Sequence, residues 1–387
     1  MSILHSIASL KLKMGGMSRS VPSLCESLGA MGISLHLFSQ DWHTPDDASA
    51  IPDPRYVNTH LVRALYNPTS GFLYSPFYYQ AIADLCSDKI VRIIHDHGLW
   101  LPCNHAAAKA ARKFGIPLII QPRGTLEPWA LSYRAWKKRL VWRIYQQANL
   151  KSASLLVATS EQEAESIRKV GLRQPIAIIP NGLELPARKQ RPFLKEPKHY
   201  ALFLSRIHPK KGLMNLVDAW GNVRPEGWQM VVVGPDDGGH RAEVERAVQN
   251  AGLAGCFLFV ESVEGAAKEQ LYREAGFFVL PTFSENFGMA VAEALGYGVP
   301  VITTRGAPWE GLLRYKCGWW VNIGVEPLAK AIREATSLSD AERHRMGDRG
   351  RTFAEREFSL PKLAERMLAV YRWLLGLRER PDDVLLG

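Results

Sequence analysis

The sequence lacks the features that mark secreted, membrane-spanning or zinc-stabilised proteins. Its five cysteines are scattered through 387 residues and include no C-x-x-C pair, which is typical of a reducing cytoplasm and argues against structural zinc. No run of 18 apolar residues predicts a spanning helix. The N-terminus has no charged segment followed by an apolar one, so no signal peptide is expected. We therefore expect a cytoplasmic globular protein, without internal repeats.

Acidic residues are also in the minority. The chain carries 48 Lys and Arg against 38 Asp and Glu, a formal net charge of +10. A basic excess favours an anionic partner, such as a nucleotide, a lipid phosphate, a membrane surface or nucleic acid. No motif of a nucleic-acid-binding fold is present, so nucleic acid is not expected as the partner.

What the sequence does contain is a strand–loop–helix–strand unit at residues 275–304. A short apolar run at residues 277–280 predicts a buried strand, and a helical pattern opens at Glu285 and ends at Gly296 and Gly298. Residues 299–303 predict the next strand. Such units build parallel α/β sheets, in which ligands bind beyond the carboxyl ends of the strands. The loop at residues 284–288 is therefore a predicted ligand site.

The composition of that loop suits an oxygen-rich ligand. Glu285 supplies a carboxylate and Gly288 allows close approach of the backbone. The amides that open the helix, around Asn286 and Phe287, lack intrahelical partners. Glu293 follows eight positions later, roughly 12 Å along a helix that rises about 1.5 Å per residue. That separation argues against two carboxylates sharing a proton and favours two contacts to one extended ligand.

A second motif follows a strand predicted at residues 200–204. Arg206, Lys210 and Lys211 precede Gly212 and the start of a predicted helix. An arginine can bind two oxygens at once, a lysine supplies a compact charge, and a helix start offers free amides. The pattern predicts a clamp for a diphosphate, and a basic surface loop is the alternative.

Together these two motifs resemble those of the retaining glycosyltransferases of family four. The segment P-T-F-S-E-N-F-G-x4-E-A-L-x-x-G-x-P-V resembles the family's E-x7-E signature, and Arg206 and Lys211 occupy the two positions of its R-x4-K pattern. The resemblance implies that Glu285, with residues 286–288 beside it, contacts the donor sugar, and that Glu293 contacts the nucleotide ribose. It also implies that Arg206 and Lys211 hold the donor diphosphate.

The resemblance implies an α/β fold of the GT-B type, in which two Rossmann-like domains with parallel sheets face a central cleft. We predict an N-terminal acceptor-side domain at residues 1–185, a proline- and cation-rich linker at 186–199 and a nucleotide-sugar-binding domain at 200–360. Residues 361–387 are expected to form a C-terminal helix that returns toward the first domain, followed by a frayed tail from residue 377.

In the predicted N-terminal domain, Gly15 and Gly16 lie between a strand and a helix. This arrangement suits close approach of a phosphate, but an ordinary tight turn has the same sequence features, and the G-x-G-x-x-G fingerprint is absent. The resemblance implies that the Gly16 amide lies near the donor diphosphate, with Gly15 in support.

Two histidines and an arginine follow further predicted strands. His95 and His97 come after the β-branched run at residues 90–94, and alternation places both imidazoles on one side. Two histidines without a third ligand nearby are a weak metal motif, so no metal is expected. The resemblance favours His97, and His95 second, as a contact to the donor sugar or acceptor hydroxyl, and a structural hydrogen-bonding role stays open. Arg123 suits a phosphate or sugar-linked anion, or else a structural ion pair.

Residues 129–145 interleave cations with aromatic residues and contain no acid between Arg134 and Arg143. A helix of this composition is suited to an anionic membrane surface, with its aromatic rings at the level of the headgroups. The alternative is a solvated basic helix whose Trp and Tyr side chains pack inward. We predict membrane contact, which would place the protein at the inner face of the cell membrane.

The resemblance finally implies a reaction. A hexose-type sugar would pass from a GDP- or UDP-sugar donor to a lipid-linked or oligosaccharide acceptor in surface polysaccharide biosynthesis, with retention at the anomeric carbon. No D-x-D metal motif is present, so we expect no cofactor and assign catalysis to His97, Glu285, Arg206 and Lys211. The alternatives are a sugar phosphorylase or nucleotide-sugar epimerase on the same fold, and a non-catalytic basic adaptor for a membrane or nucleic acid.

Overall fold

The computed structural model describes residues 1–387 apart from 43–47, 68–71, 134 and 189–198. The chain divides into two compact units. Unit 1 comprises residues 1–182 together with residues 360–387, and unit 2 comprises residues 183–359. Most of the linker predicted at 186–199 lies outside the described residues. Among those described, no helix is long and apolar enough to cross a membrane.

Unit 1 is built on an eight-stranded sheet with the order β16-β9-β8-β7-β6-β1-β2-β3. All neighbours pair in parallel except β16 with β9. A parallel sheet buried on both faces needs strands that are apolar throughout, which is the pattern of the short central strands. The strands are β1 (Ser2–Ile7), β2 (Ser34–Asp41), β3 (Val57–Arg63), β6 (Val91–His97), β7 (Leu118–Gln121), β8 (Leu155–Ala158), β9 (Ile176–Ile178) and β16 (Val384–Leu385).

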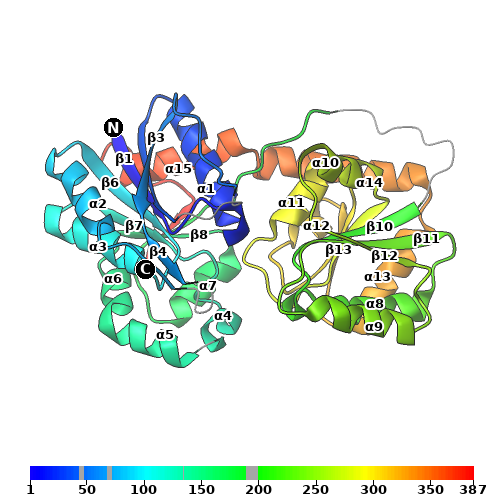
Figure 1. The fold of residues 1–387 in the computed structure, drawn as a ribbon. Coiled ribbons are helices and arrows are strands. Elements are labelled where there is room, and N and C mark those ends of the chain that lie inside the picture. The colour runs from blue at the N-terminus through cyan, green and yellow to red at the C-terminus, as the bar shows by residue number, and fades with distance from the viewer. Residues whose placement is uncertain (43–47, 68–71, 134, 189–198) are drawn as a thin grey trace. The chain divides into compact units, whose positions relative to one another are not determined.

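Helices cover both faces of this sheet (Figure 1). Successive strand residues point to opposite sides, so Leu4 joins one apolar cluster and Ile3 the other. The first cluster packs α2 and α3 against the sheet, and the second packs α1 and α15. The helices are α1 (Met17–Ala30), α2 (Tyr78–Ser87), α3 (Pro102–Phe114), α6 (Gln147–Lys151), α7 (Glu161–Lys169) and α15 (Leu360–Leu374).

Unit 2 is a six-stranded, fully parallel sheet with the order β12-β11-β10-β13-β14-β15. One large apolar core joins the sheet to its helices. The strands are β10 (His199–Leu204), β11 (Trp228–Val233), β12 (Phe257–Val260), β13 (Phe277–Leu280), β14 (Val301–Thr304) and β15 (Gly318–Val321). The helices are α8 (Leu213–Val223), α9 (His240–Asn250), α10 (Gly265–Glu274), α11 (Met289–Gly296), α12 (Gly311–Arg314), α13 (Val325–Ser337) and α14 (Asp340–Glu357).

Three local predictions were wrong. The tail is not frayed, because β16 pairs with β9 and Val384 is buried at 3% exposure. The helical pattern that opens at Glu285 becomes a helix only at Met289, since Gly288 has a φ of 83° and caps it. The segment at 129–145 is not one helix but α4 (Pro128–Ser132), α5 (Ala135–Val141) and a π-helical stretch from 142 to 146.

Candidate functional site

The structure brings the two motifs of unit 2 together at the carboxyl edge of its sheet. Lys211 closes a short 3-10 turn after β10, and Glu285 lies in the loop after β13. The Lys211 ammonium forms an ion pair with the Glu285 carboxylate. Only 12% and 13% of these side chains are exposed. Their partial burial strengthens the pair, because solvent screens it less than a surface pair.

The two loops are held together by backbone contacts. The Phe283 amide donates to the Lys210 carbonyl at 2.8 Å, and the Thr282 hydroxyl donates to the same carbonyl at 3.1 Å. Gly212, with a φ of 73°, sits so close to Pro281 that a Cβ would lie 2.0 Å from its carbonyl oxygen. A side chain at this position would push the loops apart, so the sequence specifies glycine where the motifs meet.

The loop from Glu285 to Gly288 is fixed at both ends. The Glu285 amide donates to the Gly306 carbonyl at 2.7 Å, and the indole of Trp309 donates to the Phe287 carbonyl at 2.6 Å. Phe287 is buried, which anchors the loop in the core. The loop therefore presents Glu285 and the start of α11 from a rigid base, and the first amides of that helix are available to a ligand.

Glu293 lies in α11 with both carboxylate oxygens engaged. Lys268 approaches one oxygen at 2.7 Å, and the Tyr272 hydroxyl donates to the other at 2.8 Å. Burial, with the Glu293 carboxylate beside it, raises the pKa of Tyr272 well above its usual range, so this hydroxyl keeps its proton. A ribose contact by Glu293 stays a prediction, and such a contact would share or displace these partners.

Arg206 has a different environment from Lys211. Its guanidinium forms an ion pair with Asp237, and 63% of the Arg206 side chain is exposed. Asp237 follows β11, so it comes from the same edge of the sheet as the other residues of the site. Sequence analysis did not single out Asp237, although two acidic residues shortly after a strand and a Gly-Pro pair were a signal.

In unit 1, Gly15 and Gly16 lie at the start of α1. Gly15 has a φ of 103°, which favours glycine, and Gly16 is the residue before the first turn of the helix. A Cβ at either position would meet no atom within 4 Å among the described residues. The space beside this helix start is compatible with a ligand, and the assignment of Gly16 to a diphosphate stays a prediction.

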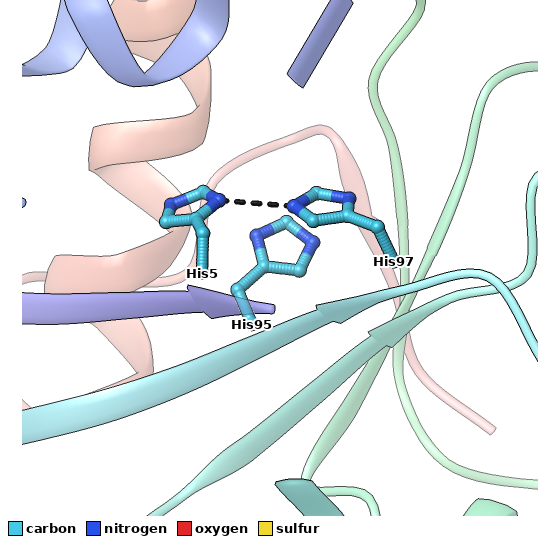
Figure 2. Close-up of side chains that lie close together, drawn as sticks. All are labelled: His5, His95 and His97. Carbon is cyan, nitrogen blue, oxygen red and sulfur yellow. Dashed lines mark hydrogen bonds between the residues drawn. The ribbon is translucent and has the colours of Figure 1, made fainter. Parts of the chain in front are cut away.

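His95 and His97 lie within β6 rather than after it, and a third histidine joins them. His5 on β1 is the register partner of His95, so the three imidazoles stand on the same side of two adjacent strands (Figure 2). His5 Nδ1 lies 2.9 Å from His97 Nε2. All three side chains are fully buried. Sequence analysis missed His5, because only the pairing of β1 with β6 brings it to the other two.

Arg123 completes this cluster from the turn after β7, with a φ of 58°. Its Nη1 donates to Ser20 Oγ at 3.0 Å and to Asn181 Oδ1 at 2.6 Å, and its Nη2 lies 3.3 Å from His97 Nδ1. Burial lowers the pKa of Arg123 to about 10, so it remains a cation at neutral pH. Arg123 is thus a partly buried, hydrogen-bonded cation close to the first turn of α1.

The histidines are neutral in this environment. Burial lowers the pKa of His5 to about 3, with a smaller effect of the nearby Arg123 cation, and lowers the pKa values of His95 and His97 well below their usual range. One nitrogen from each ring lies within 4.8 Å of the others, a spacing within reach of a single metal ion. The Arg123 cation beside His97 opposes a second positive charge there.

The segment at 129–145 exposes its apolar residues together with its cations. The exposed fractions are 41% for Trp129, 54% for Tyr133, 68% for Trp136, 55% for Leu140 and 66% for Ile144. From α5 into the stretch after it, Trp136, Leu140 and Ile144 are spaced by four residues, which suits one side of a helical segment. Exposed cations flank them at positions 137, 139 and 143. The alternative in which these aromatic residues pack inward is therefore wrong for Trp129, Tyr133 and Trp136.

Comparison with known proteins accounts for both units. The family model described as glycosyl transferases group 1 matches residues 186–353, and the glycosyl transferase 4-like domain model matches residues 15–182. D-inositol 3-phosphate glycosyltransferase 2 of Catenulispora acidiphila is 24% identical over 335 residues, which cover 75% of this chain and 74% of that protein.

Two further comparisons extend the likeness. GDP-mannose:cellobiosyl-diphosphopolyprenol alpha-mannosyltransferase of Xanthomonas campestris is 20% identical over 78% of each chain. The structure of sucrose-phosphate synthase from Thermosynechococcus elongatus matches with a TM-score of 0.77 at 20% identity, covering 98% of this chain and 100% of that chain. At that identity the structural match shows the fold alone. The chain belongs to the glycosyltransferases of family four and has their GT-B fold.

Proposed function

We propose that the protein transfers a hexose-type sugar from a nucleotide diphosphate donor, with retention and without a metal, to a lipid-linked or oligosaccharide acceptor in surface polysaccharide synthesis. The observation that carries this proposal is the partly buried Lys211–Glu285 pair at the carboxyl edge of the unit 2 sheet. The Lys211 ammonium can bind a diphosphate, and the Glu285 carboxylate can accept hydrogen bonds from sugar hydroxyls. A nucleotide sugar contains both of these groups.

We infer that the two residues of the pair separate when the donor binds, Lys211 to the diphosphate and Glu285 to the sugar. In the free protein the two charges satisfy each other. A diphosphate would compete with Glu285 for Lys211, because it brings more negative charge to the ammonium than one carboxylate does. Glu285 would then be released to accept hydrogen bonds from the sugar. Lys211, exposed Arg206 and the predicted Gly16 amide would stabilise the charge that grows on the leaving diphosphate, and the acceptor would attack from the face it leaves.

Calorimetric binding tests the nucleotide site. UDP, GDP and ADP are titrated into the protein in EDTA, with Lys211→Ala and the exposed-lysine control Lys330→Ala in parallel. We expect one nucleotide to bind to the wild type and the control and to bind at least tenfold more weakly to Lys211→Ala. Binding that needs a divalent metal, or that is equal in all three proteins, would contradict the proposal.

The products test the reaction. Proton NMR of the product formed from the preferred donor sugar should show the donor's anomeric configuration, because attack on the departing face retains it. Consumption of inorganic phosphate would instead indicate a phosphorylase, and release of an epimerised free nucleotide sugar would indicate an epimerase. Either result would overturn the proposed transfer.

We also propose that the surface at 129–145 binds an anionic membrane, which would hold the enzyme at the inner face of the cell membrane. The exposed rings of Trp129, Tyr133 and Trp136 can enter the headgroup region, and the cations beside them add about 1 kcal/mol each near anionic lipid. The Xanthomonas relative takes a diphosphopolyprenol acceptor by its name, and an acceptor of that kind would lie in the same membrane.

Vesicle sedimentation tests this surface. Vesicles with 30% phosphatidylglycerol should retain the protein and phosphatidylcholine vesicles should not. Trp136→Ala combined with Arg139→Glu should abolish the binding, whereas Leu258→Ser, at an apolar residue of β12 with similar exposure, should not. Equal binding by both variants, or equal binding to both kinds of vesicle, would exclude the surface at 129–145 as the membrane contact.

A further inference from the structure

A chain of hydrogen bonds joins the C-terminal helix to Arg123 through the three histidines. The Tyr371 hydroxyl on α15 lies 2.8 Å from His95 Nδ1 and 3.2 Å from His5 Nε2. His5 Nδ1 contacts His97 Nε2 at 2.9 Å, and His97 Nδ1 contacts Arg123 Nη2 at 3.3 Å. Tyr371 is fully buried, as the histidines are. Each internal member of the chain thus has two partners and no access to water.

Elementary chemistry fixes the direction of this chain. A guanidinium donates hydrogen bonds and never accepts them, so His97 Nδ1 accepts from Arg123 only when it is the unprotonated nitrogen of its ring. The ring proton is then on Nε2 and is donated to His5 Nδ1. His5 in turn carries its proton on Nε2 and donates it to Tyr371. The hydroxyl donates its own proton to His95 Nδ1, so every internal member accepts one bond and donates one.

The opposite direction is opposed by the Arg123 cation. It would place a protonated Nδ1 of His97 against the N–H groups of Arg123. Gln121 Oε1 lies 3.2 Å from the same His97 Nδ1, so the forward direction requires the Gln121 amide to be turned so that it presents its NH₂ group, which exchanges the positions of its oxygen and nitrogen. The neutral state that the forward direction requires of all three rings agrees with their burial.

The chain is more than packing requires. Its far end, His95 Nε2, is buried with no hydrogen-bond partner among the described residues. An unpartnered buried polar atom costs free energy that an apolar side chain in the same space would not. The three buried imidazoles, on the same sheet face as Ile3 and Ile93, and the buried Tyr371 hydroxyl on α15 therefore point to a role in orienting Arg123 rather than in stabilising the core.

We propose that Tyr371 is a positioning residue for sugar transfer, acting through His5 to hold His97 in the form whose Nδ1 accepts from Arg123. This rests on the proposed function and names Arg123 as the contact of unit 1 to the anionic part of the donor. Ser20 and Asn181 hold one terminal nitrogen of Arg123, and His97 holds the other. With both ends held, the guanidinium keeps one orientation.

A metal ion on the three imidazoles would be a different use of the same residues. It would require His97 Nε2 or His5 Nδ1 to give up the bond between them, and it would add a dication beside Arg123. None of the three imidazoles bonds to a carboxylate among the described residues. A dication in this buried pocket would repel the Arg123 cation, against which the nearby Glu163 carboxylate supplies one negative charge.

Tyr371→Phe is the direct test, because it removes the hydroxyl and keeps the ring. We expect kcat to fall about tenfold while KM for the nucleotide sugar changes less than about twofold, since a misoriented Arg123 loses mainly transition-state stabilisation. NMR of the ring nitrogens in ¹⁵N-histidine protein should show His97 protonated only on Nε2 in the wild type. In Tyr371→Phe it should show a mixture of both tautomers.

Tyr78→Phe is the matched control. Tyr78 is an equally buried tyrosine in the other core of unit 1, where its hydroxyl bonds to Ser6 and to the carbonyls of Ile7 and Phe38. Its loss should lower stability without altering kcat or the His97 tautomer. His5→Asn breaks the chain at its middle and should reproduce the kcat of Tyr371→Phe, and the double variant should lose no more than either single one.

An unchanged His97 tautomer in Tyr371→Phe, or an unchanged kcat, overturns the proposal. So does the appearance of d–d absorption bands on titration with Co²⁺, which would show the imidazoles acting as metal ligands. The NMR measurement does not depend on turnover. A wild-type protein with the expected tautomers but no transfer from any nucleotide sugar would therefore refute the proposed function and not the hydrogen-bond chain.

Discussion

At the scale of single residues, the ion pair between Lys211 and Glu285 predicts different consequences for its two members. Glu285→Ala should lower transfer about 10- to 100-fold, the loss expected from one or two hydrogen bonds to a charged group at roughly 1.5–3 kcal/mol. The Kd for the nucleotide diphosphate should change less than about threefold, because Lys211 remains. Lys211→Ala should weaken both. Steady-state kinetics and calorimetry measure the two effects, and unchanged transfer in Glu285→Ala would remove it from the site.

Asp96 gives a prediction of pH dependence. It lies between His95 and His97, is fully buried and accepts from Asn104 Nδ2 at 3.0 and 3.1 Å. Burial raises its pKa to about 7, against about 3.9 in an unfolded chain. The folded state therefore binds the proton more tightly, and the stability that this carboxyl contributes is complete below about pH 4 and lost as the pH rises toward 7.

Replacement by asparagine removes that titration. The free energy of unfolding of Asp96→Asn, relative to the wild type, should increase between pH 4 and pH 7. Urea unfolding at pH 4, 5.5 and 7 measures the difference, and the titration of the histidines cancels in it to first order. A difference that stays constant over this range would mean that Asp96 does not hold a proton in the folded protein.

Contacts between residues that are distant in the sequence were not predicted. Lys211 and Glu285 were each assigned from a local motif, and their contact across 74 positions was not predicted. His5 carried no spacing signal, because nothing in a lone strand histidine indicates its partner. His5 gains its partners only when β1 pairs with β6 in a register that sets His5 beside His95.

At the scale of elements, the last strand gives the clearest prediction. Val384 in β16 is buried in the cluster that also contains α15, and Arg366 of α15 bonds to Asp383 at 2.6 Å. Val384→Ala should lower the free energy of unfolding by about 1–2 kcal/mol, from lost burial and the cavity left behind. Leu386→Ala, at a neighbour with 58% exposure, should change it by less than about 0.5 kcal/mol.

Urea unfolding measures both variants. Equal stability of Val384→Ala and the wild type would mean that the tail is frayed after all, as its sequence suggested. The sequence pattern could not reveal β16, because two residues carry no periodicity and the strand exists only through its pairing with β9. The same reason applies to the short hairpin of β4 (Leu65–Asn67) and β5 (Phe72–Tyr74), which was also missed.

The central strands were predicted much better. β13 has the boundaries of the apolar run at residues 277–280, and β10 begins one residue before the strand predicted at 200–204. Strands covered on both faces are apolar at every position, so their ends coincide with the ends of the run. The edge strand β3 instead mixes buried, half-buried and exposed residues. Burial on both sides, rather than propensity, is what made the core readable from the sequence.

At the scale of the whole molecule, the fold and the enzyme class were predictable, and the chemistry of the acceptor was not. Two motifs in residues 200–304 carried the family resemblance, and both family models now match, one in each half of the chain. The acceptor depends on side chains for which no pattern in one sequence is diagnostic. Our proposal for the acceptor rests on the described residues of the exposed surface at 129–145.

The division into two units predicts how a nucleotide should act on the whole chain. Both Lys211 and Glu285 belong to unit 2, so a bound nucleotide diphosphate stabilises that unit directly. At about 100 times its Kd, a ligand adds about 2.7 kcal/mol to the free energy of unfolding, which for a domain of this size corresponds to an increase in Tm of about 5–10 °C.

Scanning calorimetry in EDTA should show this increase for the wild type and for Lys330→Ala. In Lys211→Ala the increase should fall to about half or less at the same nucleotide concentration, because tenfold weaker binding reduces the added stability to about 1.4 kcal/mol. An equal increase in all three proteins would place the nucleotide elsewhere in the chain, and no increase in any of them would argue against a metal-free nucleotide site.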